Sequence, residues 1–189
     1  TGDVIGAEVR GIDLHRGLTE EQVTAIKTAW QEYLVLLIRD QQINDNELVA
    51  FSRHFGILEL APANEFTLRG NVDMPDVPPE ISVISNVKVS GQPIGALGSL
   101  EADWHTDMSF MEEPPLGSIL YALEIPSQGG DTGFCNMYAV YESLPQNVQA
   151  RIHGLIAVHD NSLTSAGTLR KGFERVTDVT KVPGARHPM

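Results

Sequence analysis

The stretch D-W-H-T-D-M-S-F at residues 103–110 alternates polar side chains with larger, mostly apolar ones. Such alternation predicts a β-strand, because successive side chains of a strand point to opposite faces of its sheet. On this strand His105 and Asp107 would share one face, while Trp104 and Phe110 would lie on the other. The stretch therefore predicts a strand that is covered on its apolar face and presents a histidine and a carboxylate together.

A histidine and an aspartate on one face of a strand can bind the same metal ion. One imidazole nitrogen and one carboxylate oxygen suit Fe(II), and a third ligand from another strand would complete the facial triad of non-haem oxygenases. The His-x-Asp pattern is common, and the alternative interpretation is a strand whose polar face meets water. The apolar opposite face and the glycine-rich segment 88–102, which would form a substrate entrance, favour the metal site.

Short apolar segments bounded by glycine or proline lie on both sides of this stretch. Thr19 opens a capping box with Gln22, Asn44 is typical of a helix N-cap, and Pro145 interrupts a helical segment that begins near residue 137. Further strands are predicted at residues 35–40, 81–85, 117–125 and 155–161. This order predicts a mixed α/β (α+β) fold with a double-stranded β-helix, or jelly-roll, core and flanking helices.

The predicted strands number about six, which is fewer than the eight of a jelly roll. A chain of 189 residues with 42% hydrophobic residues is long enough to form one sizeable core. We therefore expect residues 1–189 to belong to a single domain whose C-terminal strands are missing from this chain.

The charge and cysteine content exclude several classes of partner. Thirteen basic and 25 acidic residues give a net charge of −12, which repels nucleic acids and anionic membrane surfaces. No apolar segment is long enough to span a membrane. Cys135 is the only cysteine, so we expect no intramolecular disulfide, a buried thiol and a reducing cytoplasm. The sequence predicts a cytoplasmic protein that acts on a small molecule, and we expect it to form a homo-oligomer.

A second polar motif, G-G-D-T, occupies residues 129–132. Gly129 and Gly130 supply the positive φ angles of a tight turn, and Asp131 can accept a hydrogen bond from the backbone of that turn. Thr132 would then begin a strand with its hydroxyl group available to a ligand.

The order of these motifs resembles a known family. W-H-T-D, P-P-x-G-S-I-L-Y-A and G-G-D-T follow one another as in the taurine dioxygenase / 2,4-dichlorophenoxyacetate dioxygenase (TauD/TfdA) family of Fe(II)- and 2-oxoglutarate-dependent dioxygenases. The resemblance includes G-A-E-V-x-G-I-D-L near the start, A-F-S-R-x-F-G at residues 50–56 and H-P at residues 187–188. It thus covers nearly the whole chain.

This resemblance implies roles for individual residues. His105 and Asp107 match the first two iron ligands, and Thr132 matches the threonine that binds a carboxylate of 2-oxoglutarate. The third ligand, a histidine, and an arginine that binds the far carboxylate are expected beyond Met189. His187 matches the histidine of the H-P segment and not the ligand. The implied reaction consumes O2 and releases succinate and CO2, and Asp107 favours hydroxylation because related halogenases have a small residue there.

The substrate is expected to be a small organic acid of the carboxylate or sulfonate type. Taurine itself is disfavoured, because Ala61, Asn64 and Glu101 replace residues of the taurine site. Asn86, Glu101 and Phe110 are the candidate pocket residues, and G-G-D-T-G-F is similar to members that act on aryloxyalkanoates. Two alternatives stay open: a non-catalytic jelly-roll protein that binds a ligand or serves as a scaffold, and a zinc hydrolase that uses the same ligands.

Overall fold

The computed structural model describes residues 5–60, 77–98, 102–164, 167–170 and 172–189. Its contacts divide into two compact units, each of which is described by itself. The first unit comprises Thr1–Leu58 and Ile119–Arg151, and the second comprises Glu59–Ser118 and Ile152–Met189.

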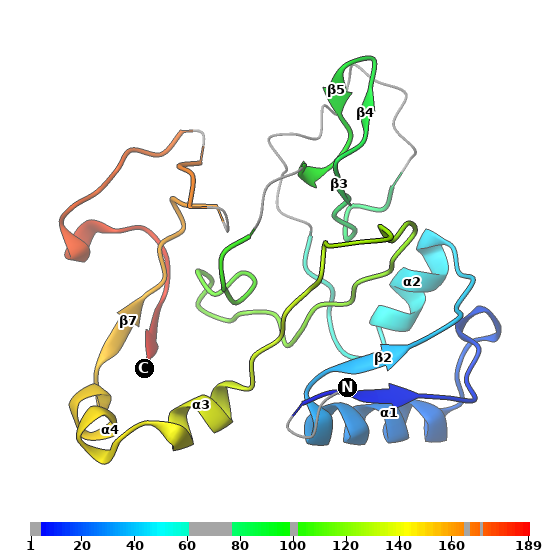
Figure 1. Cartoon of the computed structure of the whole chain (residues 1–189), viewed down its shortest axis with the longest axis horizontal. Coiled ribbons are helices and arrows are strands. Elements are labelled where there is room, and N and C mark those ends of the chain that lie inside the picture. Colours follow the sequence, from blue (N-terminus) through cyan, green and yellow to red (C-terminus); the bar gives the residue numbers. More distant parts are fainter. Residues whose placement is uncertain (1–4, 61–76, 99–101, 165–166, 171) are drawn as a thin grey trace. The chain divides into compact units, whose positions relative to one another are not determined.

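The first unit begins with two parallel strands that are joined by a helix. Strand β1 (Ala7–Val9) pairs with β2 (Leu36–Ile38), and helix α1 (Glu20–Tyr33) packs along both strands (Figure 1). The predicted capping box of α1 is confirmed: the Thr19 hydroxyl accepts from the Gln22 amide at 3.2 Å, and the Gln22 side chain accepts from the Thr19 amide at 2.9 Å. These bonds satisfy two amide groups that a helix start otherwise leaves free.

The core of this unit lies between the strands, α1 and a second helix. Helix α2 (Asp45–Ser52) starts at the predicted N-cap Asn44 and also has a capping box, and the 3-10 helix η1 (Leu14–Arg16) contacts it. The buried centre consists of Leu14, Ile26 and Phe51, surrounded by partly buried apolar residues of β1, β2 and the connecting segments. Each such side chain contributes about 1.5–3 kcal/mol by leaving water.

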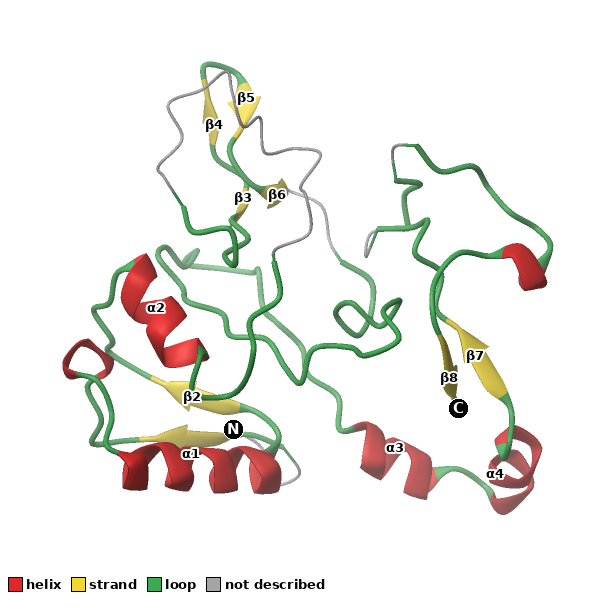
Figure 2. Cartoon of the chain, turned by 180° about the vertical axis from the view of Figure 1, so that it is seen from behind, coloured by secondary structure: helices red, strands yellow, loops and turns green. Residues whose placement is uncertain are grey.

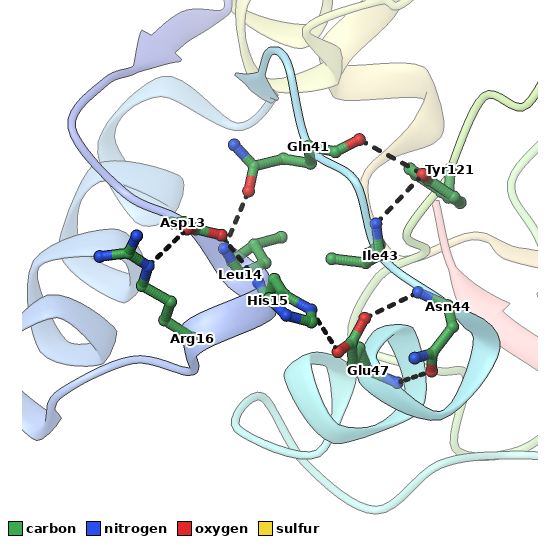
Figure 3. Close-up of polar contacts among 9 residues, drawn as sticks. All are labelled: Asp13, Leu14, His15, Arg16, Gln41, Ile43, Asn44, Glu47 and Tyr121. Atoms are coloured by element: carbon green, nitrogen blue, oxygen red, sulfur yellow. Dashed lines mark hydrogen bonds and ion pairs between the residues drawn. The ribbon is translucent and has the colours of Figure 1, made fainter.

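Hydrogen bonds of Tyr121 tie the later segment of the first unit to the earlier one. The Tyr121 hydroxyl donates to the Gln41 carbonyl oxygen and accepts from the Ile43 amide, both at 3.3 Å. The Gln41 side chain in turn accepts from the Leu14 amide at 2.9 Å (Figure 3). Because carboxamide and phenol groups each donate and accept, they satisfy backbone groups of two separate loops here.

The remaining helices of the first unit flank Pro145. Helix α3 (Met137–Ser143) begins at Asn136, whose side chain accepts from the Ala139 amide, and α4 (Gln146–Ile152) follows. The predicted interruption at Pro145 is therefore confirmed. Cys135, just before α3, is exposed, so the prediction of a buried thiol is wrong. Among the described residues no helix is long and apolar enough to cross a membrane.

The second unit contains short paired strands (Figure 2). Strand β3 (Ile84–Ser85) is parallel to β6 (Ala96–Leu97), β4 (Lys88–Val89) and β5 (Gln92–Pro93) form a hairpin, and β7 (Ile156–Val158) is antiparallel to β8 (Arg186–Pro188). The 3-10 helix η2 (Val179–Lys181) precedes β8. The hairpin turns at Ser90 and Gly91, which both have positive φ angles. The strands predicted at 81–85 and 155–161 are thus confirmed in part.

Two predicted strands are wrong. Residues 103–110 are irregular with a turn at 107–110, and residues 117–125 form no ladder. The alternation and apolar composition of these segments suit strands, but a strand also needs a neighbouring backbone to accept and donate its hydrogen bonds. The described residues supply none for residues 117–125, and Leu123 and Ile125 are 81% and 79% exposed. The described chain mixes helices with four two-stranded sheets and forms no closed barrel.

Candidate metal site

His105 and Asp107 lie side by side in the second unit. The His105 Nε2 atom is 3.1 Å from Asp107 Oδ1. The pair lies outside any strand: His105 stands in irregular backbone, and Asp107 opens a turn in which the Met111 amide donates to the Met108 carbonyl at 3.0 Å and Met108 has a φ of 51°. The predicted proximity of the two side chains is therefore present, although its structural cause is different.

The other nitrogen of His105 binds a backbone carbonyl. His105 Nδ1 lies 2.6 Å from the Asp103 carbonyl oxygen, which can only accept, so Nδ1 carries the hydrogen. Nε2 lies 3.1 Å from Asp107 Oδ1, the distance of a hydrogen bond, or of an ion pair when the ring is protonated. Without a hydrogen on Nε2, these two atoms present lone pairs side by side and could bind one cation. The same arrangement, with Nδ1–H bound to a backbone carbonyl, is typical of metal-binding histidines.

The second oxygen of Asp107 is held by Ser118. The Ser118 hydroxyl donates to Asp107 Oδ2 at 2.8 Å, which leaves Oδ1 directed at His105. Sequence reasoning did not assign this role to Ser118, although the serine belongs to the quoted P-P-x-G-S motif. The site is open, since the side chains of His105 and Asp107 are 39% and 59% exposed.

Two protein ligands alone make an incomplete site. Among the described residues no group of three histidine, cysteine, aspartate or glutamate side chains could hold a metal ion. The pair His105–Asp107 fits Fe(II) in the type and orientation of its donor atoms, because one imidazole and one carboxylate are two members of the facial triad. A third ligand would have to come from elsewhere in the protein.

The other predicted site residues are distributed over both units. Thr132 is exposed in the first unit and follows Gly129 and Gly130, whose φ angles of 72° and 73° confirm the predicted turn. No strand begins at Thr132, so that expectation is wrong. Asn86 is exposed between β3 and β4.

Phe110 lies in the second unit, in the turn that follows Asp107. The ring is half-buried, and the Arg170 guanidinium carbon lies 5.5 Å from its centroid, within the range of a cation–π contact. Glu101, Ala61 and Asn64 lie outside the described residues.

Comparison with known proteins identifies the family of the chain. The family model described as "Taurine catabolism dioxygenase TauD, TfdA family" matches residues 1–189. The chain belongs to the TauD/TfdA family. The sequence resemblance is thereby confirmed over the whole chain.

The chain matches only part of the length of its curated relatives. It is 36% identical over 180 residues to pentalenolactone F synthase of Streptomyces avermitilis, covering 94% of this chain and 54% of that protein. It is 33% identical over 164 residues to the alpha-ketoglutarate-dependent 2,4-dichlorophenoxyacetate dioxygenase of Cupriavidus pinatubonensis, covering 82% of this chain and 55% of that protein. The chain thus spans about half the length of these curated relatives.

A solved structure supports the fold assignment. This chain resembles the crystal structure of AAD-2 in complex with Mn(II) and N-oxalylglycine, with 25% sequence identity and a TM-score of 0.67. The match covers 100% of this chain and 61% of that one. The structural neighbours are TauD-like dioxygenases, which have a jelly-roll core. The mixed α/β prediction is confirmed, while the described residues of this TauD/TfdA chain form two-stranded sheets and no closed barrel.

Proposed function

We propose that the protein is an Fe(II)- and 2-oxoglutarate-dependent dioxygenase that hydroxylates a small organic acid. The observation that carries the proposal is the close pair of metal-ligating atom types, His105 Nε2 and Asp107 Oδ1, 3.1 Å apart. The Asp103 carbonyl fixes the tautomer of one and the Ser118 hydroxyl orients the other. Membership of the TauD/TfdA family and the activities that its curated relatives are named for support the same reaction class.

In this proposal each residue of the chain has one task. His105 and Asp107 hold the iron, and Thr132 binds a carboxylate of 2-oxoglutarate. The bound iron, with 2-oxoglutarate and O2, supplies the oxidant for a C–H bond, and the products are the alcohol, succinate and CO2. Because Asp107 neutralises only part of the charge of a divalent ion, the site stays positive and attracts an anionic co-substrate into an otherwise acidic protein.

The chain's length relative to its relatives bears on the missing ligand. It spans about half of the curated proteins that it matches. We propose that residues 1–189 are part of one dioxygenase domain, and that the third histidine ligand and the arginine for the far carboxylate follow Met189. The acidity and the single cysteine support a cytoplasmic protein that has neither nucleic acid nor membrane as a partner, and we propose that it forms a homo-oligomer.

A small carboxylate or sulfonate-type acid is the proposed substrate. One curated relative is named for 2,4-dichlorophenoxyacetate, which is an aryloxy acid. The replacements at Ala61, Asn64 and Glu101 disfavour taurine. Asn86, Glu101 and Phe110 stay candidates for the residues that contact this acid.

The alternatives find less support. A scaffold or ligand-binding protein has no physical need for a histidine whose tautomer is fixed toward an oriented carboxylate, so the pair favours the enzyme. The zinc hydrolase shares these ligands, but the family membership favours oxygenase chemistry.

The test uses the full-length protein with Fe(II), 2-oxoglutarate and air. We expect succinate to form, with hydroxylated product for a matching member of a panel of small carboxylates and sulfonates. Asp107→Ala should lower the rate of succinate formation by about 100-fold or more, because it removes an iron ligand. Asp103→Ala is the matched control, since it keeps the backbone carbonyl that binds His105. Equal succinate from the wild type and Asp107→Ala, or none from the wild type with any acid, contradicts the proposal.

A further inference from the structure

We propose that His187 is a positioning residue of the metal site, and that it acts by holding the backbone that follows Asp107. The inference rests on the proposed role of His105 and Asp107 as metal ligands. The residues that carry it, in the turn at 107–111 and in β8, all belong to the second unit.

The His187 ring binds two backbone carbonyls of the turn. Its Nε2 atom lies 3.0 Å from the carbonyl oxygens of both Ser109 and Met111. Carbonyl oxygens only accept, so Nε2 carries a hydrogen that the two oxygens share. Between them, the Phe110 carbonyl accepts from the Ala185 amide at 2.9 Å. Three consecutive carbonyls after the ligand Asp107 are therefore bound by β8 or the residue that precedes it.

This turn needs such support because its backbone is strained. Met108, which directly follows Asp107, has a φ of 51°, in the left-handed region where a β-carbon meets the following carbonyl oxygen. Residues in this conformation persist only when their surroundings hold them. The turn is closed by the Met111 amide, which donates to the Met108 carbonyl, and Met111 is one of the residues that His187 binds. His187 therefore stabilises the backbone that continues directly from the proposed ligand Asp107.

His187 is itself fixed in place. In the β7–β8 ladder it stands opposite Ala157, and the His159 amide donates to the Ala185 carbonyl at 2.9 Å. The rings of His159 and His187 pack edge to face, with their centroids 4.9 Å apart. Because Nε2 is occupied by two carbonyls, the ring acts on the backbone of the turn. This use agrees with the expectation that His187 is not an iron ligand.

The test measures metal affinity in the full-length protein, with Mn(II) as the probe and the electron paramagnetic resonance signal of the free ion as the readout. We expect His187→Ala to weaken Mn(II) binding about 10-fold, as is usual for the loss of a group that supports a ligand. His187→Gln should restore affinity to within about 3-fold of the wild type, because its amide can donate to the same carbonyls. His153→Ala changes an exposed histidine of the same unit and is the matched control.

A double variant tests the link to Met108. Glycine adopts positive φ angles without steric cost, so Met108→Gly should reduce the loss that His187→Ala causes. In the metal-free protein, His187→Ala should also speed hydrogen exchange of the Met111 and Ala185 amides, whereas His187→Gln should do so less.

The outcomes separate this inference from the proposed function. A wild type that binds no Mn(II) overturns both. Equal affinity of the wild type and His187→Ala overturns the positioning role alone, as does a His187→Gln variant as weak as His187→Ala. If His187→Ala lowers the Mn(II) affinity as much in the Met108→Gly variant as in the wild type, the link to the strained turn is overturned. If His187→Ala does not fold, then the Mn(II) affinity of His187→Gln and the exchange rates of its Met111 and Ala185 amides are compared with those of the wild type.

Discussion

At the scale of single residues, the carboxylate of Asp107 has two oxygens with different partners. Oδ2 accepts from the Ser118 hydroxyl at 2.8 Å, and Oδ1 faces His105. A carboxylate with one oxygen fixed in this way cannot rotate freely, so its other oxygen is already oriented toward an incoming metal ion.

Replacement of Ser118 should therefore weaken metal binding at the proposed site without removing a proposed ligand. In Ser118→Ala the carboxylate of Asp107 can rotate, and we expect Mn(II) affinity to fall about 10-fold. Ser118→Thr keeps a hydroxyl and should stay close to the wild type. Ser109→Ala is a matched control, because Ser109 contributes its backbone carbonyl to the site. Isothermal titration of the metal-free protein with Mn(II) measures all four proteins, and an unchanged affinity in Ser118→Ala would show that the hydrogen bond has no positioning role.

The sequence was sufficient to predict which side chains meet at this site, but not how. His105 and Asp107 are two residues apart, so both a strand and a tight turn can bring them close. The left-handed conformation of Met108 carries no sequence signal, because methionine is not a residue that favours it. The Asp103 carbonyl that fixes the tautomer of His105 is a backbone group, and any residue at that position would supply it.

At the scale of elements, the capping box at the start of α1 is the most local of the confirmed predictions. We expect Thr19→Ala to lower the free energy of unfolding by about 1 kcal/mol, because the Gln22 amide loses its acceptor. Thr19→Ser keeps an oxygen at the same place and should cost only a small part of this. Urea unfolding followed by circular dichroism compares the variants. A loss in Thr19→Ser as large as that in Thr19→Ala would mean that the methyl group of the threonine, and not its hydroxyl, matters.

Helices were predicted better than strands because their signals are local. The starts of α1 and α2 depend on residues within one turn, at Thr19 and Asn44. The β4–β5 hairpin was missed, although the dipeptide Ser90–Gly91 is a turn signal. The error at 117–125 has a different cause, since the pairing of a strand depends on a neighbour that local sequence does not specify.

At the scale of the whole molecule, one segment has the composition of a buried strand and the surroundings of a surface loop. Residues 117–125 are rich in leucine and isoleucine, and Leu116, Leu120, Leu123 and Ile125 are all largely exposed. Apolar surface of this extent usually marks a place where another part of a protein binds. The chain spans about half the length of its curated relatives. The proposed C-terminal part of the domain is the occupant that explains both facts.

This assignment predicts a difference between residues 1–189 alone and a longer protein that includes the residues after Met189. In the longer protein we expect the amides of residues 117–125 to exchange with solvent at least about 100-fold more slowly, because paired strand amides are protected by local stability. Mn(II) affinity should rise in parallel as the third ligand is supplied. The amides of α1 are the internal control, since the helix already forms its own hydrogen bonds and packs against β1 and β2. Fast exchange of residues 117–125 in both proteins would show that this segment is no part of the dioxygenase core, even if the metal site is completed.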